Sequence, residues 1–73
     1  MMLNLASVPA ISSGRFEWQH GTSFVSGFRV RLASNPEAQR EWTGAEIFLK
    51  RPSEILDEVE AWCQAVLDYE AGP

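Results

Sequence analysis

The stretch that decides the fold is residues 53–70, SEILDEVEAWCQAVLDYE. Apolar residues recur in it at steps of three and four positions, which is the spacing that places side chains on one face of an α-helix. They are Ile55, Leu56, Val59, Trp62, Cys63, Val66 and Leu67. This pattern predicts a long C-terminal helix whose apolar face is buried against another layer of the protein.

The opposite face of the predicted helix is acidic. It carries Glu54, Asp57, Glu58 and Asp68, with Glu60 at its edge, and the stretch contains no lysine or arginine. Opposite charges four residues apart usually contribute about 0.2–0.5 kcal/mol per pair to an exposed helix, and this helix has no such pair. The pattern is consistent both with a solubilising outer face and with a surface that binds a basic partner.

The chain is acidic overall, with 73 residues and a net charge of −4. A negative field argues against a protein that mainly coats nucleic acid or an anionic membrane. Residues 53–73 hold six acidic residues and no basic one, whereas residues 1–52 hold six basic and four acidic residues. The single cysteine excludes an internal disulfide and a cysteine-based zinc site. Because the sequence has no membrane-length apolar run and no signal-peptide pattern, a cytoplasmic protein is expected.

Alternating apolar and polar residues predict a β-hairpin ahead of the helix. Residues 15–19 and 23–32 have apolar side chains at every second position, and a turn at residues 20–22 joins them. Gly27 interrupts the second strand and indicates a bulge. The residues expected to face the helix from the whole sheet are Phe16, Trp18, Phe28, Val30, Ile47 and Leu49.

The remaining segments are the third strand, the chain ahead of it, the N-terminus and the start of the long helix. Residues 45–49 are expected to form the third strand, with Phe48 facing outward. An Asn-Pro pair ahead of it starts either a wide turn or a short helix near residues 36–42. Residues 1–14 are expected to be a flexible lead-in, an edge strand or a strap over the core. Ser53 is the predicted N-cap of the long helix.

Together these elements predict a single two-layer α+β domain over residues 15–73. Its architecture is a three-stranded antiparallel sheet with one long C-terminal α-helix packed across it. A domain of this size buries a modest core, so association with a partner or a second copy would add stability.

No residue pattern indicates catalysis or metal binding. His20 lies in a predicted turn without the nearby partner that a general base or a metal ligand needs. Cys63 lies on the apolar helix face, where a buried core role is expected rather than a reactive thiol. The helix carboxylates have no base or nucleophile beside them. The sequence therefore predicts neither an enzyme nor a metal or cofactor site.

A second candidate surface is the outer face of the predicted sheet. Arg29 and Arg31 point outward there and could contact phosphates, as β-ribbon proteins do. Glu17 and Glu46 are predicted on the same face, so cross-strand ion pairs are the simpler interpretation. Phe48, with Trp42 nearby in the sequence, adds a modest apolar patch for a partner or a second copy. The residues of this second surface are Phe48, Trp42, Arg29 and Arg31.

In size, acidity and sheet-plus-helix layout, the chain resembles the small acidic inhibitors encoded by phages and other mobile elements, including anti-CRISPR proteins. The resemblance is carried by the whole chain and by no particular motif. It implies a non-enzymatic protein that blocks the nucleic-acid site of a larger complex.

We therefore expect the acidic helix face to imitate nucleic acid and to occupy a basic, nucleic-acid-binding surface of a larger protein complex. The residues expected to bind this partner are Glu54, Asp57, Glu58, Glu60 and Asp68. Two alternatives stay open: a homodimeric regulatory subunit, and a small DNA-binding protein that uses the arginines of the sheet.

Overall fold

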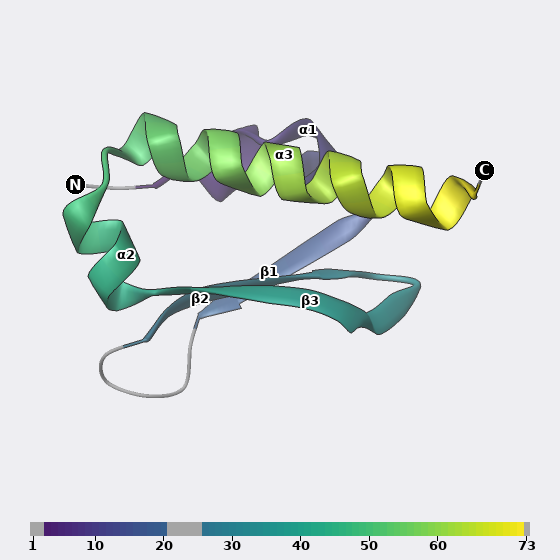
Figure 1. The fold of residues 1–73 in the computed structure, drawn as a ribbon, viewed down its shortest axis with the longest axis horizontal. Coiled ribbons are helices and arrows are strands. Elements are labelled where there is room, and N and C mark those ends of the chain that lie inside the picture. Colours follow the sequence, from purple (N-terminus) through teal and green to yellow (C-terminus); the bar gives the residue numbers. More distant parts are fainter. Residues whose placement is uncertain (1–2, 21–25, 73) are drawn as a thin grey trace.

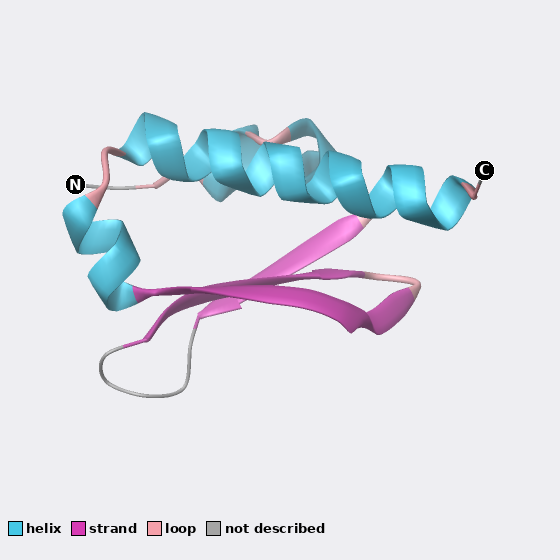
Figure 2. Ribbon diagram, viewed as in Figure 1, coloured by secondary structure: helices cyan, strands magenta, loops and turns pink. Residues whose placement is uncertain are grey.

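Three antiparallel strands form one layer of the protein, and a long helix crosses one face of them to form the other (Figure 1). The computed structural model describes residues 3–20 and 26–72. Figure 2 shows the elements by type. In chain order they are η1 (Leu5–Ser7), α1 (Pro9–Ser12), β1 (Phe16–His20), β2 (Ser26–Leu32), β3 (Asn35–Thr43), α2 (Gly44–Leu49) and α3 (Pro52–Ala71). The predicted α+β class, the three-stranded antiparallel sheet and the long C-terminal helix are confirmed.

The first two strands form an antiparallel pair in which Phe16 lies opposite Leu32. The sheet order is β1-β2-β3, so β2 is central and β3 is an edge strand. β1 continues through His20, which was predicted to begin a turn. The rest of that predicted turn, residues 21–22, and the start of the predicted second strand, residues 23–25, lie outside the described residues.

Gly27 marks a place where β2, β3 and α2 approach closely. The register between β2 and β3 shifts between Ser26 and Phe28, as the glycine in the sequence predicted. A Cβ atom at position 27 would overlap the side chain of Ile47 and the backbone oxygen of Trp42. Only glycine therefore fits here without a shift of the neighbouring backbone.

The third strand lies earlier in the chain than predicted. β3 includes residues 36–42, which are neither a turn nor a short helix, and residues 45–49 belong to α2 instead of a strand. The reason is a capping box: Thr43 Oγ1 accepts a hydrogen bond from the Glu46 N–H at 3.2 Å, and Glu46 Oε1 accepts one from the Thr43 N–H at 3.4 Å. This reciprocal pair starts a helix at the point where apolar alternation alone suggested a strand.

The N-terminal segment is helical and contributes to the core. Residues 5–12 form two short helical turns instead of an edge strand, with Pro9 at the first position of α1. Leu5 and Val8 are buried. α1 contacts both α3 and β1, so this segment covers part of the sheet face that α3 leaves open.

The core lies between α3 and the inner face of the sheet. Trp42 is fully buried, stacks on Phe28 with ring centroids 5.3 Å apart, and meets the edge of Trp62 at 6.2 Å. The ring of Phe16 lies 5.7 Å from that of Trp62. The buried residues are Leu5, Val8, Phe16, Phe28, Val30, Leu32, Trp42, Ile55, Val59 and Cys63.

The exposure of three side chains differs from what the sequence suggested. Trp42 is wholly inside, because it follows the inward alternation of β3 and not an outer patch. Leu49 is 80% exposed, because it lies on α2 and not on a strand. Trp18 faces inward but remains 40% exposed, where it borders an open groove with Leu5 and Phe28.

Replacing Thr43 by alanine should lower the free energy of unfolding by about 1 kcal/mol, because the N-cap hydrogen bond at the start of α2 is lost. Thr43→Ser keeps the hydroxyl and is the matched control, with stability close to that of the wild type. Urea denaturation monitored by tryptophan fluorescence measures both variants. Equal stability of the two variants would contradict the capping box as the origin of α2.

Candidate interaction surfaces

The outer face of α3 carries four exposed carboxylates, from Glu54, Asp57, Glu60 and Asp68. We call these four residues the acidic ridge. At a rise of 1.5 Å per residue they extend over about 20 Å of helix. Within residues 3–20 and 26–72, no lysine, arginine or histidine forms an ion pair with them. The ridge is therefore a row of negative charge that the described part of the protein does not neutralise.

Two ridge residues also have local structural roles. Glu54 Oε1 accepts a hydrogen bond from the Arg51 N–H at 3.3 Å, which closes the first turn of α3. The helix therefore begins at Pro52 with Arg51 as its N-cap, two residues ahead of the predicted cap at Ser53. Asp68 Oδ1 accepts a hydrogen bond from Gln64 Nε2 at 3.0 Å. Asp57 and Glu60 are exposed on the same face.

Glu58 does not belong to the ridge, although the sequence placed it there. Its carboxylate turns toward β3 and α2, where it accepts hydrogen bonds from Trp42 Nε1 at 3.2 Å and from Lys50 Nζ at 2.7 Å. Arg40 Nη2 lies 3.8 Å from the same carboxylate and 3.7 Å from that of Glu46. We call these five residues the polar clamp, because they join β3, α2 and α3.

The clamp shifts the ionisation of its members. Hydrogen bonds from Lys50 and Trp42 hold the pKa of the Glu58 carboxyl below its usual value of 4.5. The reciprocal hydrogen bond to Glu58 raises the pKa of Lys50 above 10.5. The Arg40 guanidinium lies 4.3 Å from the centre of the Trp42 ring, a cation–π distance. Arg40 and Lys50 are therefore held by internal contacts.

A faint signal of the clamp exists in the sequence. Residue 58 falls between the outer and buried faces on a helical projection, and a tryptophan that is buried needs a partner for its N–H. The partner itself could not be named from the sequence, because Trp42 and Lys50 reach Glu58 only after the chain reverses direction around α2.

The second candidate surface is dispersed in the structure. Trp42 is buried, and Phe48, 87% exposed, lies on α2, whereas the two arginines lie on β2. Arg31 Nη2 lies 3.2 Å from Glu17 Oε2, as expected for a cross-strand pair, and Arg29 lies opposite Glu41 in the register. The other predicted pairing on this face is wrong, because Glu46 lies on α2 and faces Arg40.

The surroundings of His20 and Cys63 do not favour chemical reactivity. The His20 ring meets the edge of the Trp18 ring at 5.0 Å. Burial raises the pKa of the Cys63 thiol to about 11, so the thiolate is scarce at neutral pH. Among the described residues, no group of three or more histidine, cysteine or acidic side chains is placed to hold a metal ion.

The chain shows no similarity that would assign it to a known group. No protein-family model, curated protein or solved structure matches it. Of the helices that the structure describes, none combines the length and the apolar character needed to cross a membrane.

The clamp predicts a specific dependence of stability on pH. Since the folded pKa of Glu58 lies below 4.5, its ionised form stabilises the protein above that pH, and the contribution is lost as pH falls through the folded pKa. Glu58→Gln should therefore be less stable than wild type near pH 7, and the difference should shrink as the pH falls below 4.5 through the folded pKa. Thermal unfolding across this range measures it.

Glu60→Gln, on the acidic ridge, is the matched control. Its difference in stability from the wild type should not change with pH over this range. A stability difference for Glu58→Gln that stays constant down to the lowest pH would contradict the ionic role of Glu58.

Proposed function

We propose that this protein is a small, non-enzymatic binding protein whose acidic ridge occupies a basic, nucleic-acid-binding surface of a larger protein complex. The observation that carries the proposal is the ridge itself: four exposed carboxylates on a rigid helix, without an ion-pair partner among the described residues. Glu58 is not part of this surface.

The distribution of positive charge supports this proposal. Arg40 and Lys50 are engaged in the clamp, and none of the basic side chains that the structure describes, Arg51 at the start of α3 included, forms an ion pair with the ridge. Like charges on one face of a helix cost a little stability in the isolated protein, which an oppositely charged partner would recover. Such a row also steers a basic surface toward the helix before contact.

The proposed role is that of a cytoplasmic inhibitor that imitates nucleic acid, like the small acidic inhibitors of phages and the anti-CRISPR proteins among them. It requires no cofactor, metal or catalytic group. The contacts would be mostly ion pairs, so the affinity should fall as salt is added.

The test uses the protein immobilised on beads, with nuclease-treated lysate of its source organism as the supply of partners. Captured proteins are purified and titrated with fluorescent DNA and RNA, with and without the chain. The chain should compete with nucleic acid for the same partner. Asp57→Asn/Glu60→Gln/Asp68→Asn should weaken binding to the partner about tenfold at low salt, as expected for three exposed ion pairs of roughly 0.5 kcal/mol each.

Glu54 is left unchanged in this variant because it caps α3. The matched control, Glu17→Gln/Glu37→Gln/Glu41→Gln, removes the same number of charges from the sheet and should bind like the wild type. Simultaneous binding of chain and nucleic acid, or equal affinity of the two triple variants, would contradict the proposal.

A homodimeric regulatory subunit is the second candidate, favoured by the exposed side chains of Phe48 and Leu49. They are 87% and 80% exposed, next to one another on α2. Direct DNA binding has less support, because Arg31 is paired with Glu17 and Arg29 faces Glu41.

If α2 joins two copies, the wild type should sediment as a dimer at high micromolar concentration, and Phe48→Ser should sediment as a monomer with unchanged thermal stability. Burial of such aromatic side chains is a main source of interface energy. A monomeric wild type under these conditions would remove the dimer candidate.

A further inference from the structure

The last two turns of α3 are packed less closely on the sheet than the turns before them. Ile55, Val59 and Cys63 are buried, whereas Val66 is only partly buried and Tyr69 is 85% exposed. Open cavities lie on both sides of this end of the helix. Apolar surface of α3 is therefore left uncovered where the helix extends past the centre of the sheet.

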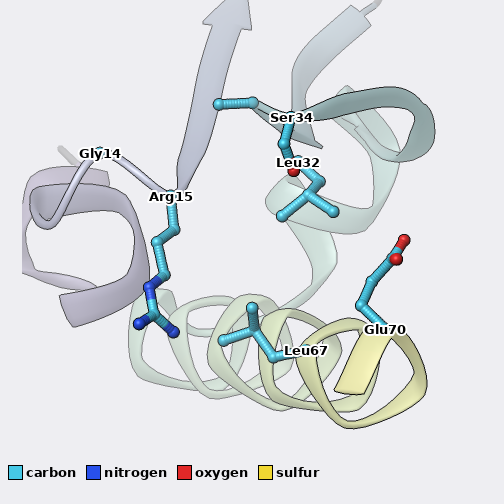
Figure 3. A pocket seen from close by; sticks show the side chains of 7 residues that line it. Gly14, Arg15, Leu32, Ser34, Leu67 and Glu70 are labelled. Atoms are coloured by element: carbon cyan, nitrogen blue, oxygen red, sulfur yellow. The ribbon is translucent and has the colours of Figure 1, made fainter. Parts of the chain in front are cut away.

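The first of these cavities lies between α3, the start of β1 and the β2–β3 turn (Figure 3). Its volume is about 370 Å³, and the side chains of Arg15, Leu67 and Glu70 border it. Arg15 and Glu70 give this cavity one positive and one negative side chain, so its charge favours no particular ligand. The cavity does show that the end of α3 lies away from the sheet.

The second cavity is a groove of about 380 Å³ between α3 and β3. We call it the β3–α3 groove. Its apolar lining is Ala38, Trp62, Ala65, Val66 and Tyr69. No described residue pairs with the outer side of β3, which is an edge strand. The pairing with β2 is regular over residues 39–42 of β3, and the register shifts nearer the turn, between Arg31 and Leu32. Along the regular part, alternate N–H and C=O groups point away from β2 and are free to pair with another chain.

The groove also has a negative end. Glu37 and Glu70 both border it, and neither forms an ion pair with a described residue. The carbonyl groups at the C-terminus of α3 add partial negative charge beside Glu70. Arg40, further along β3, is turned toward Glu46 and Glu58. A positively charged side chain is therefore the complementary occupant of this end.

We propose that the β3–α3 groove binds an extended peptide that adds to β3 as a fourth strand. Alternate side chains of an added strand point to the same face, so apolar residues at every second position would enter the groove beneath α3. A lysine or arginine of the peptide pairs with Glu37 and Glu70. This surface is separate from the acidic ridge, so the inference does not rest on the proposed function.

The test begins with a phage-displayed library of random dodecapeptides selected on the full chain. Enriched sequences should alternate apolar residues and carry a lysine or arginine at one end. Synthetic peptides with the enriched sequences should bind the full chain, with a dissociation constant measurable by fluorescence anisotropy. In the complex, β3 amides that do not pair with β2 should exchange with solvent more slowly than in the free protein.

Ala65→Arg places a long, positively charged side chain in the groove without changing the core, and it should weaken binding of the peptides at least about tenfold. Ala61→Arg is the matched control: it lies on the exposed side of the same helix, one turn earlier and outside the groove, and should leave binding unchanged. Glu37→Gln/Glu70→Gln should weaken binding roughly fivefold at low salt, and Glu60→Gln should not.

Three results would overturn the proposal. One is a selection that enriches no sequence, and another is enriched peptides that bind Ala65→Arg and Ala61→Arg equally well. The third is a dimer of the free protein that Ala65→Arg dissociates, because a second copy would then occupy the edge of β3. The asparagine and glutamine substitutions of the acidic ridge should leave peptide binding unchanged, so failure here and failure of the proposed function are distinguishable.

Discussion

The burial of Trp42 beneath α3 is the contact on which the rest of the structure depends. Its ring stacks on Phe28 of β2 and meets the edge of Trp62 of α3, so one side chain connects both layers. Removal of a buried aromatic side chain typically costs about 3–5 kcal/mol. In a domain of 73 residues, where a small core provides most of the stability, that is a large share of the whole.

The polar clamp follows from that burial. An indole N–H taken out of water needs an acceptor, and Glu58 supplies it. The carboxylate then attracts Lys50 and Arg40, which fixes α2 against α3 and draws the nearby cations inward. Both cations are thereby paired with Glu58 and not with the carboxylates of the acidic ridge. The same contact that stabilises the core thus takes two cations away from the ridge.

The two proposed binding surfaces have a common origin in the size of the sheet. The sheet buries one face of the 20-residue helix α3 as far as Cys63, and the last two turns are covered less closely. The β3–α3 groove lies beside these turns, while the opposite side of the same helix presents the acidic ridge. A small domain with both an unpaired strand edge and an uncovered helix flank gains stability when a partner covers them.

The sequence by itself determined the long helix, its buried face and the pairing of the first two strands, because these depend on periodicity and on neighbours close in the chain. It also determined that α3 has no positive charge. The position of the third strand was wrongly predicted although its signal is local, since Thr43 and Glu46 lie only three residues apart. Apolar alternation at residues 45–49 fitted a strand, but the hydrogen bonds of Thr43 with Glu46 start a helix there, and the place of the strand passes to the segment that buries Trp42.

The tertiary structure alone decided which carboxylates are available to a partner. Glu58 and its neighbours on the helix look alike in sequence, and only the contact with Trp42 and Lys50 separates it from them. The same holds for the exposure of Trp18, which borders a groove with Leu5 and Ile47, and for the groove between β3 and α3. Helical periodicity reports which face of a helix is apolar; it does not report which distant side chain will lie against each position of that face.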